Sequence, residues 1–155
     1  MFCKILDAIC ERSSCHRIKV GALIVREGRT ISTGWNGSYS GGEHCDDHFN
    51  GVNTDTQEFL DAHAVFSNRY EIHAEQNAIA FAARNGISTE GSTLYLSLSP
   101  CVSCAKLVVA AGITTVYYRD VYDRSIEGID FLIGAGITVE RIILPVQECD
   151  PPSDQ

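Results

Sequence analysis

The chain has 155 residues, 45% of them hydrophobic, which suits a single domain with a substantial core. Its 12 Lys and Arg against 20 Asp and Glu give a net charge of −8, which argues against a protein that grips nucleic acid through phosphates. No apolar run approaches the ~20 residues of a membrane helix, and residues 1–4 show no signal-peptide pattern.

The cysteine content points to a reducing environment. There are seven cysteines, an odd number that does not suit a closed set of disulfides. Without an export signal, we expect a cytoplasmic protein whose thiols are reduced and serve partly as metal ligands.

The first half of the chain predicts a helix, a hairpin and a long connection. Residues 5–9 have the apolar spacing of an amphipathic helix. Two apolar runs, 20–25 and 30–34, are separated by a short polar turn with a glycine and predict a β-hairpin. Residues 37–70 are mostly polar, with one short helix expected around 59–66. An insert of this length in a compact domain is normally functional or pinned by something outside itself.

The second half alternates helices and strands. A helix follows His73 and is expected to stop at Asn85-Gly86. Later strands pair in parallel when helices separate them, whereas the opening hairpin is antiparallel. We therefore predict one domain over residues 1–155, an α/β fold of the three-layer α/β/α sandwich type with a mixed five-stranded sheet. The later elements are a strand at 93–98, a helix at 101–111, a strand at 114–118, a helix at 125–135 and a strand at 137–143.

Two short motifs in this half carry metal-binding side chains. They are His73-Ala74-Glu75 and Pro100-Cys101-Val102-Ser103-Cys104. One histidine and two cysteines leave an open coordination position, which is the pattern of a catalytic zinc, whereas structural zinc usually takes four ligands. Glu75 remains as a carboxylate for proton transfer. The combined pattern H-x-E…P-C-x-x-C is the signature of zinc-dependent deaminases.

The spacing also predicts where these residues lie on their helices. Pro100 suits a first helical position after an N-cap at Ser99, and Cys101 and Cys104 then share one face of the first turn. His73 and Glu75 can converge on one metal only at a helix start, where the chain is still turning. We therefore expect two helices that point their N-termini at one zinc. A redox cysteine pair and a packed core histidine are the plainer alternatives.

With these motifs the chain resembles the deoxycytidylate (dCMP) deaminase branch of the cytidine-deaminase superfamily. The zinc motifs are shared by the whole superfamily, whereas Gly34-Trp35-Asn36-Gly37 with a long insert bearing histidine and cysteine is more particular to this branch. Gln76 departs from the leucine that is frequent there. The matching segments are Lys19-Val20-Gly21-Ala22, residues 32–37, residues 73–79 and residues 99–104.

The resemblance implies hydrolysis of dCMP to dUMP and ammonia, which supplies dUMP for thymidylate synthesis. Zinc activates a water, and Glu75 takes its proton and delivers it to N3 of cytosine. The water oxygen attacks C4, and Glu75 then passes a proton to the departing amine. The resemblance also implies that the Ala74 N–H holds the base carbonyl, that the Ser99 carbonyl accepts from the amino group, and that Asn36 binds the sugar hydroxyl. Turn chemistry alone would also explain an Asn-Gly pair.

The phosphate partners and the assembly are further expectations. Tyr122 and Arg124 follow the fourth strand, near the strand ends where ligands bind in α/β sheets, although an isolated arginine is more often a solvated surface residue. The resemblance implies a homo-oligomer, a hexamer, regulated by dCTP and dTTP. Phe81 and Arg84 are the candidates for the regulatory or subunit contact.

A second, structural zinc is expected to pin the insert. Cys15, Cys45, His48 and His63 remain as possible ligands, with Cys45 and His48 at C-x-x-H spacing, and Cys₂His₂ is a normal closed set. The resemblance supports an additional zinc here. Otherwise Cys15 is a buried apolar residue and the histidines are exposed loop residues. The fallback ligands are His16, His44, Asp46 and Asp47.

Two other functions compete with this prediction. The first is a different zinc deaminase, acting on cytidine, guanine or tRNA adenosine, although the negative charge and the long insert argue against the tRNA substrate. The second is a non-catalytic binding protein stabilised by zinc. Retention of Glu75, which ligates nothing, argues against that alternative.

Overall fold

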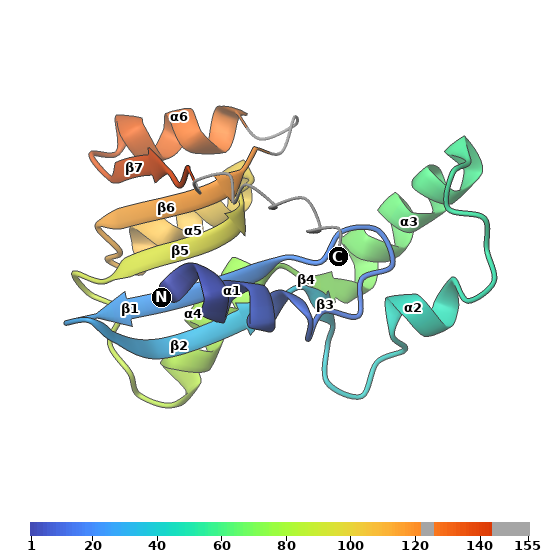
Figure 1. Ribbon diagram of the computed structural model, residues 1–155, viewed down its shortest axis with the longest axis horizontal. Coiled ribbons are helices and arrows are strands. Elements are labelled where there is room, and N and C mark those ends of the chain that lie inside the picture. Colours follow the sequence, from blue (N-terminus) through green and yellow to red (C-terminus); the bar gives the residue numbers. More distant parts are fainter. Residues whose placement is uncertain (122–125, 144–155) are drawn as a thin grey trace, which may run out of the picture.

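The computed structural model describes residues 1–121 and 126–143, and its centre is one five-stranded sheet with the order β2-β1-β5-β6-β7 (Figure 1). β1 is antiparallel to both β2 and β5, whereas β6 and β7 continue from β5 in parallel. The predicted mixed sheet is confirmed. The strands are β1 (Gly21–Arg26), β2 (Arg29–Trp35), β5 (Thr93–Leu98), β6 (Thr115–Asp120) and β7 (Thr138–Arg141).

Helices cover both faces of the sheet. α1 (Phe2–Cys10) lies on one face, and α4 (Ala74–Arg84), α5 (Val102–Ala110) and α6 (Ile126–Gly134) lie on the other (Figure 1). The interior strand β1 is buried from both sides, which explains its unbroken apolar sequence. Its Ala22 and Ile24 face the three-helix layer, whereas Leu23 and Val25 face α1. The sheet and the helices packed on its two faces are the three layers of the sandwich.

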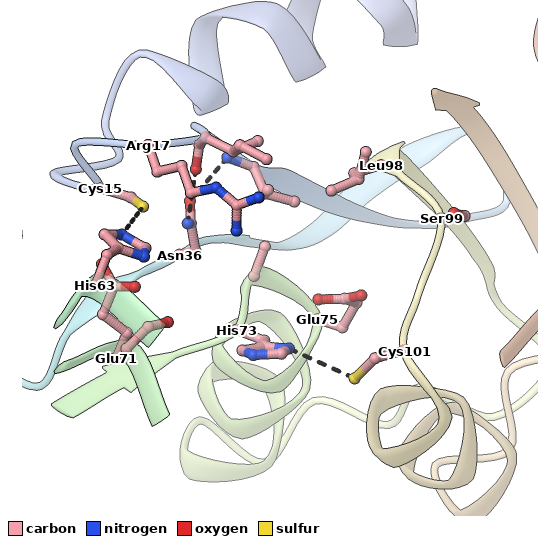
Figure 2. A pocket seen from close by; sticks show the side chains of 14 residues that line it. Cys15, Arg17, Asn36, His63, Glu71, His73, Glu75, Leu98, Ser99 and Cys101 are labelled. Carbon is pink, nitrogen blue, oxygen red and sulfur yellow. Dashed lines mark hydrogen bonds between the residues drawn. The ribbon is translucent and has the colours of Figure 1, made fainter. Parts of the chain in front are cut away.

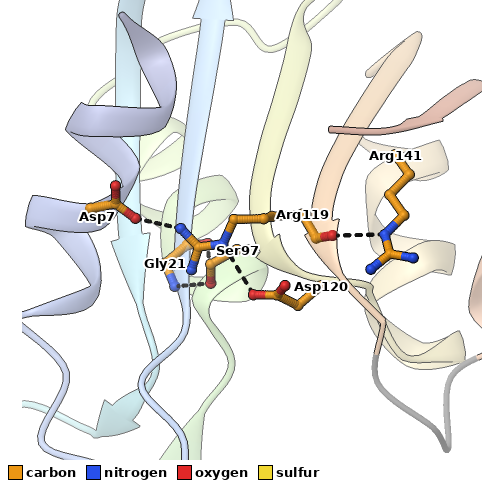
Figure 3. Close-up of polar contacts among 6 residues, drawn as sticks. All are labelled: Asp7, Gly21, Ser97, Arg119, Asp120 and Arg141. Carbon is orange, nitrogen blue, oxygen red and sulfur yellow. Dashed lines mark hydrogen bonds and ion pairs between the residues drawn. The ribbon is translucent and has the colours of Figure 1, made fainter. Parts of the chain in front are cut away.

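Polar contacts fasten α1 to the far strands of the sheet (Figure 3). Arg119 of β6 forms an ion pair with Asp7 of α1 and a second one with Asp120, at 3.0 Å. Arg141 of β7 donates through Nε to the Arg119 carbonyl at 3.0 Å. The carboxyl end of β6 is therefore tied to its neighbours on either side.

The insert forms a separate small unit beside the ends of the strands (Figure 1). Thr56 caps α3 by accepting a hydrogen bond from the Phe59 N–H at 3.1 Å. The insert contains α2 (Cys45–His48), α3 (Gln57–Tyr70) and a two-stranded antiparallel ribbon of β3 (Gly37–Ser38) and β4 (Glu71–Ile72).

The insert has a small apolar core, which its mostly polar composition does not predict. Phe49, Phe59 and Phe66 are buried together with Cys15 and Cys45. The ring of Phe49 contacts the rings of Phe59 and Phe66 edge to face, with centroid distances of 5.2 Å and 5.5 Å. Phe59 and Phe66 lie on one face of α3 at helical spacing, whereas Phe49 comes from a separate segment, so only the tertiary structure joins it to them. Among the described residues, none of the helices is long and apolar enough to span a bilayer.

Candidate metal centre and its pocket

The strand directions bring the functional residues to one edge of the sheet. Because β1 runs antiparallel to β5, with Ala22 opposite Leu96, the start of β1 lies beside the end of β5. The loop before β1 and the segment after β5 therefore meet at this edge, beside the end of β2. They line a pocket together with the start of α4 and part of the insert (Figure 2).

The residues His73, Cys101 and Cys104 come together at the starts of two helices. His73 is the N-cap of α4, Cys101 is the N-cap of α5, and Cys104 is in the first turn of α5. α5 thus begins after Cys101 and not at Pro100 as predicted. His73 Nδ1 lies 3.6 Å from Cys101 Sγ and 3.4 Å from Cys104 Sγ. Zinc–sulfur and zinc–nitrogen bonds in a tetrahedral site separate such ligand atoms by roughly 3.5 Å, so these residues fit the metal.

Hydrogen bonding makes one of the two thiols strongly acidic. Hydrogen bonds from Cys104 and His73 lower the pKa of Cys101 to about 3. The same interaction with Cys101 raises the pKa of Cys104 and of His73. The pair therefore holds a ready thiolate for a cation, and the second sulfur loses its proton when the metal binds.

Glu75 is buried beside this centre, with 4% of its surface exposed. Burial raises the pKa of its carboxyl, so the group holds a proton at higher pH than an exposed glutamate. Ala74, the first residue of α4, lies in the same pocket, and an N–H at that position has no partner within the helix.

Three side-chain hydrogen bonds hold the first turns of α4 in place. The Gln76 side chain accepts a hydrogen bond from the His73 N–H at 2.9 Å, which gives this departure from leucine a capping role. Asn77 Nδ2 donates to the Trp35 carbonyl at 2.7 Å, and Ser32 Oγ donates to the Ala78 carbonyl at 2.6 Å. Both bonds tie the start of α4 to β2.

Asn36 braces the loop that precedes β1. Its Oδ1 accepts from Ser13 Oγ at 2.6 Å and from the Val20 N–H at 2.7 Å, and its Nδ2 donates to the Ile18 carbonyl at 2.9 Å. The side chain also lines the pocket. One amide N–H remains for a ligand after these bonds, so its contact with the sugar stays a prediction.

A second cluster contains Cys15, Cys45, His63 and Glu71, whose ligand atoms all lie within 4.8 Å of one another. Cys15 Sγ is 3.3 Å from His63 Nε2, again a spacing that suits a shared zinc (Figure 2). Glu71 Oε1 is buried without a hydrogen-bond partner. A cation at this position would satisfy that oxygen, since buried polar atoms are normally paired.

Burial dominates the ionisation of this second cluster. It raises the pKa of Cys15, raises the pKa of Cys45 to about 12 and lowers the pKa of His63. The thiols are therefore neutral without a cation, and metal binding must release their protons.

The placement of His48 in this cluster is wrong. The single turn of α2 turns its side chain outward, where Nδ1 lies 3.0 Å from Glu43 Oε2 and the ring packs on Phe66, 4.6 Å between centroids. Glu71 takes the fourth place instead. It belongs to β4, and no ligand spacing in the sequence identifies it. The fallback residues His16, His44, Asp46 and Asp47 also lie outside the cluster.

Arg17 is the pocket residue that sequence reasoning missed. It lies on the loop between Cys15 and β1, and Figure 2 shows its side chain reaching over the pocket. Among the described residues that line the pocket it is the only Lys or Arg. No motif marks it, because its position depends on how the loop folds.

The remaining predicted residues lie elsewhere. Ser99 lines the pocket, as expected. Tyr122 and Arg124 lie outside the described residues. Phe81 and Arg84 are exposed on α4, away from the pocket lining, with 54% of the Phe81 surface exposed.

Comparisons with known proteins agree with this geometry. Residues 1–120 match the family described as the cytidine and deoxycytidylate deaminase zinc-binding region. The chain is 40% identical to the deoxycytidylate deaminase of Enterobacteria phage T4, covering 86% of this chain and 84% of that protein. The phage T2 enzyme is 39% identical, with 86% of each covered. The dCMP deaminase of cyanophage S-TIM5, solved in complex with dCMP and dUMP, gives a TM-score of 0.74 at 34% identity, covering 91% and 93% of the two chains.

Metal stoichiometry tests the second cluster. We expect two zinc ions per chain in protein purified without chelator, and one in Cys45→Ser, because a buried ligand is lost. The variant should also become sensitive to proteolysis within residues 37–70. Cys3→Ser, which changes a cysteine outside both clusters, is the control and should keep two. A single zinc in the wild type would contradict the second site.

The fourth ligand of that cluster can be tested separately. Glu71→Gln should release the second zinc more readily, because a neutral amide is a weaker ligand than a carboxylate. His48→Ala should retain it, since His48 lies outside the cluster. Equilibrium competition with a chelator measures both. The reverse ranking of the two variants would restore His48 as the ligand.

Proposed function

The chain belongs to the cytidine and deoxycytidylate deaminase family, in its dCMP deaminase branch, and we propose that it hydrolyses dCMP to dUMP and ammonia with the help of zinc. The observation that carries this proposal is the meeting of His73, Cys101 and Cys104 at two helix starts, with Glu75 buried beside them. The dUMP product is a substrate for thymidylate synthesis, so we place the reaction in pyrimidine nucleotide supply.

The catalytic work divides between the metal ligands and Glu75. When bound, zinc supplies Lewis-acid activation of a water at neutral pH. His73, Cys101 and Cys104 would hold it, as their spacing allows. Glu75 takes a proton from the attacking water and delivers it to N3 of the cytosine. Once the water oxygen has bonded to C4, Glu75 takes the remaining proton from that oxygen and passes it to the amine, which leaves as ammonia when its bond to C4 breaks. A carboxyl whose pKa is raised by burial suits a group that must both accept and donate.

The surrounding backbone orients the base. The Ala74 N–H, free of helical partners, would donate to the base carbonyl, and the Ser99 carbonyl would accept from the amino group. The remaining N–H of Asn36 would reach the sugar hydroxyl. These assignments place the base at the zinc end of the pocket and the sugar toward the loop before β1.

Arg17 is the proposed partner of the 5′-phosphate. It contributes the only Lys or Arg among the described pocket residues, in a chain with a net charge of −8. A guanidinium binds phosphate through two parallel hydrogen bonds, which gives both affinity and orientation. Tyr122 and Arg124 remain predictions for the same phosphate.

Cys15, Cys45, His63 and Glu71 would hold a second, structural zinc with a closed set of four ligands. It would link the loop before β1 to both ends of the insert. We further propose a homo-oligomer, a hexamer, regulated by dCTP and dTTP, with Phe81 and Arg84 at the contact. The ring of Phe81 is exposed on α4 and is therefore available for such a contact.

Substitution of Glu75 tests the proton-transfer role. Glu75→Gln keeps the size of the side chain but cannot carry a proton, so turnover of dCMP should fall by ~10²-fold or more. Zinc content and the circular dichroism spectrum should stay at wild-type values. Near-normal turnover in this variant would show that another group moves the proton.

Substitution of Arg17 tests phosphate recognition. Arg17→Ala should lower kcat/KM for dCMP by roughly 10- to 100-fold, the value of a charge-assisted contact, and leave deoxycytidine turnover unchanged. Arg29→Ala is the matched control, because Arg29 is an exposed arginine at the turn between β1 and β2 and does not line the pocket. Equal losses with both substrates would mean that Arg17 does not bind the phosphate.

A further inference from the structure

Two glycines lie in direct contact with the turns that carry the metal ligands. Most described glycines with a positive φ have open space around them and serve turns. Gly34 and Gly128 differ, because neither has a positive φ and both are buried against backbone atoms. Among the described glycines, only these two would bring a Cβ closer than 3.0 Å to a backbone atom.

Gly34 of β2 lies under the first turn of α4. A Cβ there would be 2.2 Å from the Ala74 carbonyl oxygen and 2.4 Å from the Ala78 nitrogen. These are backbone atoms and cannot rotate away. The hydrogen bonds from Ser32 and Asn77 hold α4 to β2 on both sides of this contact. The distance between the His73 turn and β2 is thus this short only because residue 34 has no side chain.

Gly128 of α6 packs in the same way against the turn that carries the cysteine ligands. A Cβ there would be 2.0 Å from the Pro100 carbonyl oxygen and 3.0 Å from the carbonyl carbon of Cys101. α6 also packs beside α5 through Leu132, which belongs to the same core as Ala105 and Val108. The first turn of α6 therefore backs directly onto the Cys101 ligand.

We propose that Gly34 and Gly128 are positioning residues, one for each half of the metal centre. Their contacts set the distance between the His73 and Cys101 turns, whose ligand atoms are 3.6 Å apart. Metal ligands must be placed to within about 0.2 Å, and displacement of a catalytic group by ~1 Å can cost 10²-fold in rate. The inference rests on the proposed zinc-dependent deamination.

The test compares two alanine substitutions in the same helix. Gly128→Ala adds a Cβ against Pro100, whereas Gly134→Ala adds one where no atom lies within 4 Å. Alanine favours a helix over glycine at either position, so a loss at residue 128 alone must come from the contact. Gly34→Ala tests the other half, but two backbone contacts could prevent folding, so Gly128→Ala is the principal variant.

Zinc release to a chelator and steady-state kinetics give the readouts. Zinc should leave the two proposed sites in two phases. The phase that disappears in Cys101→Ser is the one that comes from the centre formed by His73, Cys101 and Cys104. In Gly128→Ala that phase should be about 10- to 100-fold faster, and kcat for dCMP should fall by a similar factor with little change in KM. Gly134→Ala should match the wild type in both, with an equal or higher melting temperature.

Two outcomes separate this inference from the function beneath it. If Gly128→Ala only melts at lower temperature, with wild-type kcat and zinc release in the folded protein, the positioning role is wrong. If the wild type does not deaminate dCMP but Gly128→Ala still speeds zinc release, the proposed substrate is wrong and the positioning role stands.

Discussion

The distance between the N-terminal turns of α4 and α5 is the constraint on which the site depends. Each turn supplies a ligand at its N-cap, and the ligand atoms of His73 and Cys101 lie 3.6 Å apart. Neither helix can set that distance alone. The sheet brings both helix starts to one edge, because α4 packs on β2 and β1 while α5 follows directly from β5, which pairs with β1. The same arrangement buries Glu75 and raises the pKa of its carboxyl.

The insert is part of the active pocket as well as an appendage to the sheet. Cys15, His63 and Glu71 of the second cluster line the same pocket as His73 and Glu75. A cation bound there would fix the loop that carries Arg17 between Cys15 and Asn36. The second cluster therefore contributes to the wall of the pocket in which we propose that the substrate binds.

Close backbone packing and a buried carboxylate are linked features of this centre. Gly34 and Gly128 let the backbones of β2 and α6 approach the two ligand turns closely. On the pocket side His73 is exposed, whereas Cys104 is buried. An ionisable group between these surfaces feels a low dielectric, which is why burial dominates the pKa of Glu75.

The sequence by itself determined the primary centre and the sheet. His73, Glu75, Cys101 and Cys104 are local motifs whose spacing follows from helix geometry, and the mixed sheet follows from an opening hairpin and later strands separated by helices. The tertiary structure alone decided the rest. Glu71 lies in the second cluster and His48 does not, because the single turn of α2 points His48 outward, and Phe49 reaches the two phenylalanines of α3 from a separate segment. The same holds for the roles proposed for Arg17, Gly34 and Gly128, because these depend on close approach between segments distant in the chain, which no local pattern encodes.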